Sequence, residues 1–276
     1  ESGDFSPENY TITTTSEITF QKIISLSNLN WEYGSPNYSN IVIVNFPSLD
    51  RIEGNFTMKY EYSLREFNAP KLREISRRLI VDYNNIEKFL LPSLENIGND
   101  CCPWSSIQEN SNLNELDLKK LKERSQGEFI IANNKTLHEI SLENFAVCRY
   151  KSENGNSSDG QTYELFIRFN QNLKKINFGS DLDLEANIKI YENENLEEIN
   201  FTKLLNVQSG YIEINNNQSL KKITFDVLES SNNVKDRNRW SEPHILIYNN
   251  NLLEEVNIPS LEDFYKIAIE NNESLP

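Results

Sequence analysis

The residues in this chain that could do chemistry are mainly its carboxylates, because Asp and Glu together number 42. Enzymes that cleave glycosidic bonds act through two carboxyl groups held about 5 to 10 Å apart. Six glutamates recur at equivalent places along the chain: Glu115, Glu139, Glu197, Glu198, Glu254 and Glu255. Lysines take the same places elsewhere: Lys174, Lys175, Lys221 and Lys222. Mixed charges at equivalent positions are typical of a solvated outer face and do not indicate a catalytic pair.

Histidine, metal and nucleophile chemistry has little support in the sequence. The two histidines, His138 and His244, stand where other repeats carry charged or polar residues, so we expect neither to act as a general base. Asp181 and Asp183 are only a pair at alternating positions, which is too few oxygen ligands for calcium. There is no phosphate-cradling glycine-rich loop and no nucleophile elbow. We therefore expect no catalytic residue, no metal and no cofactor.

The negative net charge of the chain argues against nucleic acid and anionic membranes as partners. The formal net charge is -15 and the isoelectric point is about 4.7, whereas binding to nucleic acid rests on clustered Lys and Arg. We expect neither nucleic acid nor an anionic membrane as partner. No run approaches the roughly 18 apolar residues needed for a transmembrane span. The chain starts at Glu1 without an apolar leader, so we expect a processed, soluble ectodomain.

A repeat runs through most of the chain. Its anchors are Leu64, Ile86, Leu113, Leu137, Leu173, Leu196, Leu220, Leu253 and Leu275, and the regular spacing is 22 to 24 residues. The positions three and five residues after the anchors are apolar in all eight repeats that reach them, for example Ile199 and Phe201. Alternation with a period of two indicates a strand.

A second strand precedes the anchors and also alternates, with inward pairs such as Leu165 and Ile167. Short coils of this kind cannot bury their faces alone, so they must stack with like residues above like. We predict an all-β, parallel β-solenoid over residues 41–276, preceded by an irregular N-terminal cap at 1–40. The last repeat stops just after its anchor, so we expect the natural chain to continue beyond residue 276.

Asparagine recurs three residues before seven of the nine anchors: Asn110, Asn134, Asn170, Asn193, Asn217, Asn250 and Asn272. A turn inside each coil leaves backbone groups unpaired, and an inward Asn side chain can bond to them and to its counterparts. We predict a structural asparagine ladder. Ladder members are inaccessible to glycosylation, so the candidate N-glycan acceptors are Asn9, Asn37, Asn55, Asn156 and Asn200.

Three cysteines allow at most one disulfide. If the protein is exported, we expect Cys148 to pair with either Cys101 or Cys102, and the sequence leaves both pairings open.

Candidate binding residues lie on outward strand positions and in insertions. Outward positions carry the partly aromatic strip Phe166, Arg168, Tyr191, Leu246 and Tyr248. This strip could stack on sugar rings or dock a protein, or an insertion could cover it. The repeat is interrupted at about 98–107, 148–162 and 229–243, and the last insertion places Trp240 beside Arg239. Trp240 is a candidate interface anchor, and the alternative is a Trp folded back over a coil edge.

Recurring turns carry a family resemblance. The segments FPSLDRIEG, NAPKLREI, LLPSLENIG and NIPSLEDF join strand segments through "PSL" or "PKL" turns. This pattern resembles the receptor L-domain family, which is similar to leucine-rich repeats, and especially its fungal GPI-anchored cell-wall and sporulation proteins. The resemblance covers about residues 41–276. It implies a right-handed β-helix, secreted or at the cell surface, that acts in wall organisation, adhesion or recognition without catalysis. A GPI anchor would lie outside this segment.

We therefore expect a non-catalytic, glycosylated surface protein that binds a protein or a carbohydrate of the cell surface or wall. One alternative is a β-helix enzyme that acts on polysaccharides. A second alternative is a structural surface protein that associates with itself.

Overall fold

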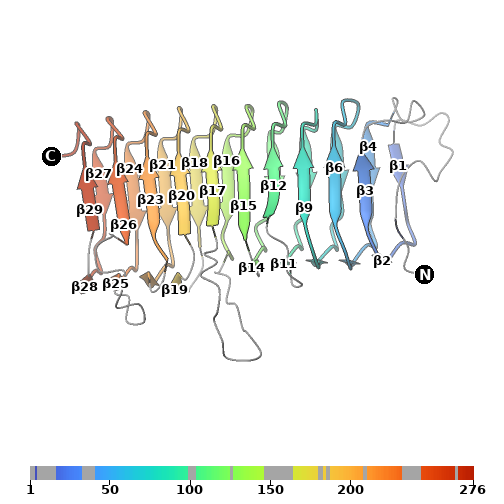
Figure 1. The fold of residues 1–276 in the computed structure, drawn as a ribbon, viewed down its shortest axis with the longest axis horizontal. Coiled ribbons are helices and arrows are strands. Elements are labelled where there is room, and N and C mark those ends of the chain that lie inside the picture. The colour runs from blue at the N-terminus through green and yellow to red at the C-terminus, as the bar shows by residue number, and fades with distance from the viewer. Residues whose placement is uncertain are drawn as a thin grey trace.

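The structure is a computed structural model and describes residues 4, 17–32, 41–98, 104–124, 127–145, 164–179, 183–184, 187–207, 210–231, 244–264 and 267–276. All regular elements in these residues are β-strands, so none of them is a helix that could cross a membrane. The chain winds in successive coils along one axis, and each strand pairs in parallel with its counterparts in neighbouring coils (Figure 1). This confirms the predicted parallel β-solenoid.

The first face of the solenoid is a ten-stranded sheet, named sheet A here. Its strands, from the N-terminal end, are β3 (Leu29–Glu32), β6 (Phe56–Lys59), β9 (Leu79–Asp82), β12 (Trp104–Gln108), β15 (Glu128–Ala132), β17 (Glu164–Arg168), β20 (Asn187–Tyr191), β23 (Ile212–Asn215), β26 (Ile245–Tyr248) and β29 (Ile267–Glu270). Sheet A runs the length of the rod and presents its outer face to the viewer in Figure 1.

The second face consists of two five-stranded sheets that follow each other along the axis. The first contains β1 (Glu17–Thr19), β4 (Ile43–Asn45), β7 (Glu66–Asn68), β10 (Lys88–Leu90) and β13 (Glu115–Asp117). The second, named sheet D, contains β16 (Glu139–Leu142), β18 (Lys175–Phe178), β21 (Glu198–Phe201), β24 (Lys222–Phe225) and β27 (Glu255–Asn257).

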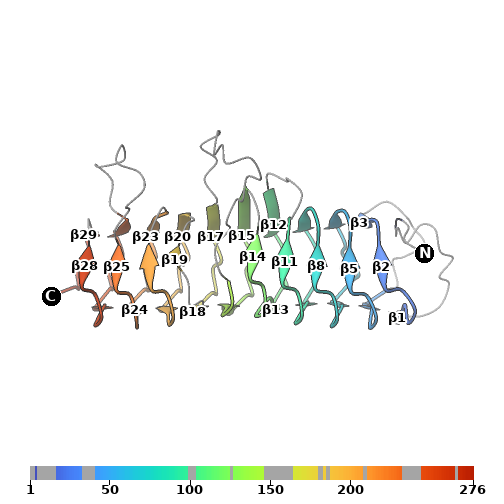
Figure 2. The ribbon, with the colours of Figure 1, turned by 90° about the horizontal axis from the view of Figure 1, so that it is seen from below.

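The third face, seen from below in Figure 2, is made of two-residue strands. Its first sheet contains β2 (Ser25–Leu26), β5 (Arg51–Ile52), β8 (Glu74–Ile75), β11 (Asn96–Ile97) and β14 (Glu123–Arg124). Its second sheet contains β19 (Asp183–Leu184), β22 (Asn206–Val207), β25 (Ser230–Ser231) and β28 (Asp263–Phe264).

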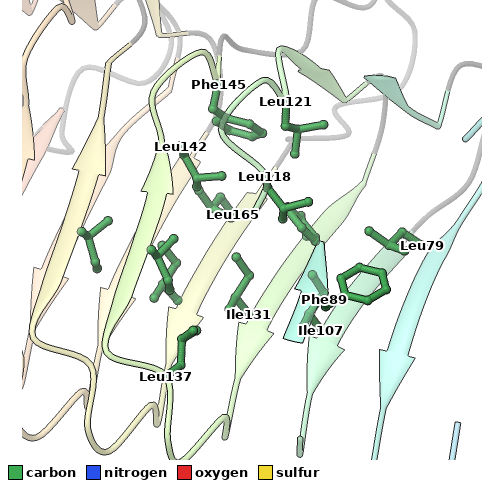
Figure 3. Close-up of a cluster of buried hydrophobic side chains, with 14 of the residues drawn as sticks. Leu79, Phe89, Ile107, Leu118, Leu121, Ile131, Leu137, Leu142, Phe145 and Leu165 are labelled. Atoms are coloured by element: carbon green, nitrogen blue, oxygen red, sulfur yellow. The ribbon is translucent and has the colours of Figure 1, made fainter. Parts of the chain in front are cut away.

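The core consists of columns of equivalent apolar residues. Ile199 lies opposite Ile223, and Ile223 lies opposite Val256, as the repeat predicts. Aromatic rings stack in the same way, for example Phe201 on Phe225 with ring centroids 4.7 Å apart. The side chains labelled in Figure 3 show this core between the faces. Each coil therefore depends on its neighbours for its apolar contacts.

The asparagine ladder is present. Each predicted ladder Asn lies three residues before its anchor because these two residues are the first and last of one turn. The N–H of Leu196 donates to the carbonyl of Asn193, which closes a turn of four residues, and most other anchors do the same. The Asn193 side chain receives the N–H of Asn170 and donates to the carbonyl of Ile167. Ladder residues from Asn110 to Asn250 are 0% exposed. The ladder thus pairs backbone groups that the turns leave free.

The ladder also includes Asn84, which the repeat did not predict because it precedes Ile86 by two residues instead of three. Its side chain donates to the carbonyl of Met58 and to Oδ1 of Asn110.

A left-handed residue precedes every ladder position. All nine non-glycine residues with positive φ among the described ones lie in this column: Tyr60, Tyr83, Glu109, Asn133, Phe169, Glu192, Asn216, Asn249 and Asn271. The left-handed region is unfavourable for most side chains, and Asn tolerates it best. Tyr60, Tyr83 and Phe169 are therefore costly choices at these turns.

The stacked coils begin earlier than the sequence predicted. Strands β1, β2 and β3 lie within the segment assigned to the cap, yet they pair in register with β4, β5 and β6. Leu29 and Trp31 are buried like the core residues of later coils. The boundary at residues 40 and 41 was therefore wrong, because residues 17–32 already form a coil.

Candidate functional site

The candidate site lies on the outer face of sheet A, where β17, β20, β23 and β26 are adjacent. Alternation along these strands turns one set of side chains inward, such as Leu165 and Ile167, and the other set outward. We name the outward set the outer patch: Glu164, Phe166, Arg168, Phe169, Lys189, Tyr191, Tyr211, Glu213, Leu246 and Tyr248. Phe169 directly follows β17, and Tyr211 directly precedes β23.

Arg168 lies on β17, at one side of the outer patch, and is surrounded by three aromatic rings. Its Cζ atom lies 5.6 Å from the ring centroid of Phe166 and 5.7 Å from those of Phe169 and Tyr191. Its Nη1 donates a hydrogen bond of 2.6 Å to the Tyr191 hydroxyl. Its Nε is buried and has no hydrogen-bond acceptor. Among the described residues, no carboxylate forms an ion pair with it, so this guanidinium retains unused donors.

Lys189, on the next strand, is in a different electrostatic state. Its ammonium group pairs with Glu164 at 2.9 Å and lies 5.1 Å from the centroid of Phe166. Burial opposes its charge, but hydrogen bonds to Tyr211 and Glu164 prevail and raise the pKa of Lys189. The positive charge of Lys189 is therefore already compensated within the protein.

The far side of the outer patch contains Leu246 and Tyr248 on β26. The Tyr248 hydroxyl donates to the Glu213 carboxylate at 2.8 Å. Burial and this hydrogen bond raise the pKa of Tyr248 to about 12, so it remains a neutral donor. Leu246 lies in register with Glu213. Glu213 is thus engaged by Tyr248, and Glu164 by Lys189.

The structure therefore brings together three predicted binding residues, Phe166, Arg168 and Tyr191. It places Leu246 and Tyr248 on the same face, on β26, which is two strands from β20 and three strands from β17. Sequence reasoning missed Lys189 and Glu213, although both are outward residues of the same alternation. It also missed Phe169, which lies beyond the strand and is 38% exposed.

A second cluster lies on the outer face of sheet A nearer the N-terminus. Trp104, expected in an insertion, is the first residue of β12, and its ring centroid lies 5.9 Å from Lys59 and 5.7 Å from Arg78. The buried Asp82 carboxylate accepts a hydrogen bond from Ser106, and burial raises the pKa of Asp82. The cluster thus contains its own negative group, although Nε of Arg78 lacks an acceptor.

The glutamates considered as catalytic candidates lie in columns of alternating charge. On sheet D, the register runs Glu139, Lys175, Glu198, Lys222, Glu255. Lys175 contacts Glu198 at 3.3 Å, and Lys222 contacts Glu255 at 3.1 Å. A hydrogen bond from Asn200, together with Lys175, lowers the pKa of Glu198. A general acid needs a raised pKa, so this environment does not suit proton donation.

The glutamates of two other columns also lie beside lysines. Glu197 lies 3.9 Å from both Lys174 and Lys221, and Lys88 lies 3.8 Å from Glu115. The described residues contain no group of three or more His, Cys, Asp or Glu side chains that could hold a metal ion.

Several predicted sites lie outside the described residues: the glycan acceptors Asn9, Asn37 and Asn156, the cysteines Cys101, Cys102 and Cys148, and Trp240. Of the two other acceptors, Asn200 uses its Nδ2 in hydrogen bonds to Asn177 and Glu198. Asn55 accepts the N–H of Arg78 at its Oδ1. An attached glycan would therefore disturb fewer contacts at Asn55 than at Asn200.

Comparisons of the chain with protein-family models, curated proteins and solved structures found no match. Function is therefore inferred from the geometry of the outer patch.

Proposed function

We propose that this chain is a non-catalytic recognition protein of the cell surface or wall, which binds a protein or carbohydrate partner through the outer patch. The observation that carries the proposal is the state of Arg168. A partly buried guanidinium, held between three rings and left without a carboxylate, is a ready anchor for a partner.

The position of the patch supports binding. Strands β17, β20, β23 and β26 each pair with a neighbour on both sides, so the patch rests on a rigid sheet. Binding sites on such elements keep their geometry better than sites on loops. Recognition there must use side chains, because the backbone groups are already paired.

The glycan acceptor at Asn55 and the resemblance of the "PSL" turns to receptor L-domains support a surface location. The ion-pair columns of sheet D favour binding over polysaccharide cleavage, because their carboxylates have lysine partners.

The test compares the purified chain with two triple variants on a panel of immobilised wall polymers, namely neutral glucan, mannan, chitin and polygalacturonate. One variant replaces Phe166, Tyr191 and Tyr248 by Ala. The control replaces the exposed Tyr60, Tyr62 and Tyr83 by Ala, which removes the same number of aromatic rings elsewhere on the surface. We expect wild type and control to bind at least one polymer and the patch variant to lose at least tenfold in affinity, with no release of reducing ends. Equal binding by both variants, or steady release of reducing ends, would contradict the proposal.

A further inference from the structure

We infer that the outer patch binds an acidic polysaccharide, with a uronate carboxylate on Arg168 and sugar rings on the neighbouring aromatic side chains. This inference rests on the proposed function and specifies the ligand.

Arg168 is the group on the outer patch that can attract an anion. The outer patch contains two basic side chains, and one of them, Lys189, has a carboxylate at 2.9 Å. Arg168 has none among the described residues, and its Nη1 donates a hydrogen bond to the Tyr191 hydroxyl. A guanidinium offers five donors in a fork that fits a carboxylate. Because Nε is enclosed by the protein, the terminal nitrogens of the guanidinium are the donors to which an anionic group of the ligand would bind.

The acidic groups of the patch do not compete for this place. Glu164 is held by Lys189 at 2.9 Å, and Glu213 is held by the Tyr248 hydroxyl at 2.8 Å. More distant acids of the protein are screened at physiological ionic strength, where the Debye length is about 8 Å. An anionic ligand can therefore approach Arg168 despite the negative net charge.

The rest of the patch matches a sugar. Phe166, Phe169, Tyr191, Leu246 and Tyr248 supply apolar surface for the C–H faces of pyranose rings. Glu213 and Tyr248 supply polar groups for hydroxyls. An extended polysaccharide laid along the solenoid axis meets a new strand about every 4.8 Å, close to the length of one sugar residue.

An acidic peptide fits less well. Peptides commonly bind a sheet by adding a strand to its edge or fill a groove between elements. The strands of the patch are interior strands of sheet A with neighbours on both sides, so no edge is free there.

The experiment measures binding by titration calorimetry at 0.15 M salt with three probes. These are polygalacturonate, its fully methyl-esterified neutral form, and poly-L-glutamate, which has carboxylates but no sugar. The variants are Arg168→Gln, Arg168→Lys, and the control Arg73→Gln, which makes the same charge change on the third face. Circular dichroism confirms that each variant is folded.

We expect polygalacturonate to bind wild type and Arg73→Gln equally, and at least tenfold more tightly than the other two probes. Arg168→Gln should lose at least tenfold in affinity for it, and Arg168→Lys should lose less. Equal loss in Arg73→Gln, equal binding of the ester, or equal binding of poly-L-glutamate would each overturn the inference. If the patch variant loses binding to a neutral polymer of the panel while polygalacturonate does not bind, the inference fails and the proposed function stands.

Discussion

The backbone N–H of Glu61 donates to Oδ1 of Asn84 at 2.9 Å, so Glu61 holds the ladder position that asparagine occupies in the following coils. Its carboxyl group also receives a hydrogen bond from the Trp31 side chain. Burial dominates, and it raises the pKa of Glu61 to about 7. The ladder therefore ends, on its N-terminal side, in a carboxyl group that titrates near neutral pH.

The first prediction is a pH-dependent gain of stability in Glu61→Asn. The pKa of Glu61 is raised from 4.5 to about 7 in the folded state, so its contribution is fully present below pH 4.5 and is lost as pH rises through about 7. The difference in the free energy of unfolding between Glu61→Asn and wild type should therefore grow with pH. After allowance for partial solvent screening, we expect it to be about 1 to 2 kcal/mol larger at pH 8 than at pH 4.5.

Urea unfolding at pH 4.5, 6 and 8 measures this difference. Glu198→Gln is the control, because the pKa of Glu198 is lowered, so its difference from wild type should stay nearly constant between pH 6 and pH 8. The stabilisation from Glu198 is present above pH 4.5 and is lost as pH falls through the lowered pKa. If the free energies of unfolding of Glu61→Asn and wild type differ by the same amount at all three pH values, the pKa of Glu61 is not raised in the folded state.

The second prediction concerns the ladder. Asn193→Ala removes the acceptor of the Asn170 N–H and the donor to the Ile167 carbonyl, and both groups are enclosed by the coils. Each unsatisfied buried group costs about 1 to 3 kcal/mol, so we expect a loss of about 2 to 4 kcal/mol in the free energy of unfolding. Asn195→Ala removes one exposed bond to the Gln171 carbonyl and should cost less than about 1 kcal/mol. Denaturant midpoints of the two variants should differ clearly, and similar midpoints would mean that the ladder adds little.

The third prediction tests the charge columns. Glu198→Lys places three lysines in succession, since Glu198 lies between Lys175 and Lys222. Single surface ion pairs contribute little, but like charges directly opposite each other are unfavourable, so we expect a loss of about 1 kcal/mol. Melting curves at 0.05 M and 1 M salt should show the loss shrinking as salt rises. A loss independent of salt would point to packing instead of charge.

The fourth prediction separates stability from binding at Phe169, whose φ is 56°. Asn tolerates this conformation better than Phe, so Phe169→Asn should gain about 0.5 to 1 kcal/mol, less what the ring contact with Tyr191 contributes. It should also weaken polygalacturonate binding. Tyr83→Asn makes the same backbone change and loses the stack on Tyr60, but it should leave binding unchanged. If both variants bind equally, Phe169 has no part in recognition.

Much of the fold can be predicted from the sequence because every coil has the same pattern of inward apolar residues. Ile199, Ile223 and Val256 share a column because apolar residues three positions after the anchor must turn inward. The coil at residues 17–32 escaped notice because it lacks an anchor at the regular spacing, although Leu29 and Trp31 fill core positions. Asn84 escaped because its turn is shorter by one residue.

The site was harder to foresee because it depends on register between coils. Alternation marks Phe166 and Arg168 as outward residues, but an interruption of the repeat hides which side chains become neighbours. Coordinates are needed to see that Lys189 pairs with Glu164 and that, within the outer patch, Arg168 has no carboxylate partner. Phe169 lies at a left-handed residue after β17, where the alternation no longer applies.

The most direct test of the central claim is hydroxyl-radical footprinting of the wild-type chain with and without polygalacturonate. We expect slower oxidation of Phe166, Phe169, Tyr191 and Tyr248 in the complex, with unchanged oxidation of the exposed Tyr60, Tyr62 and Tyr83. Protection of these three tyrosines while the outer patch oxidises at its free rate would contradict it.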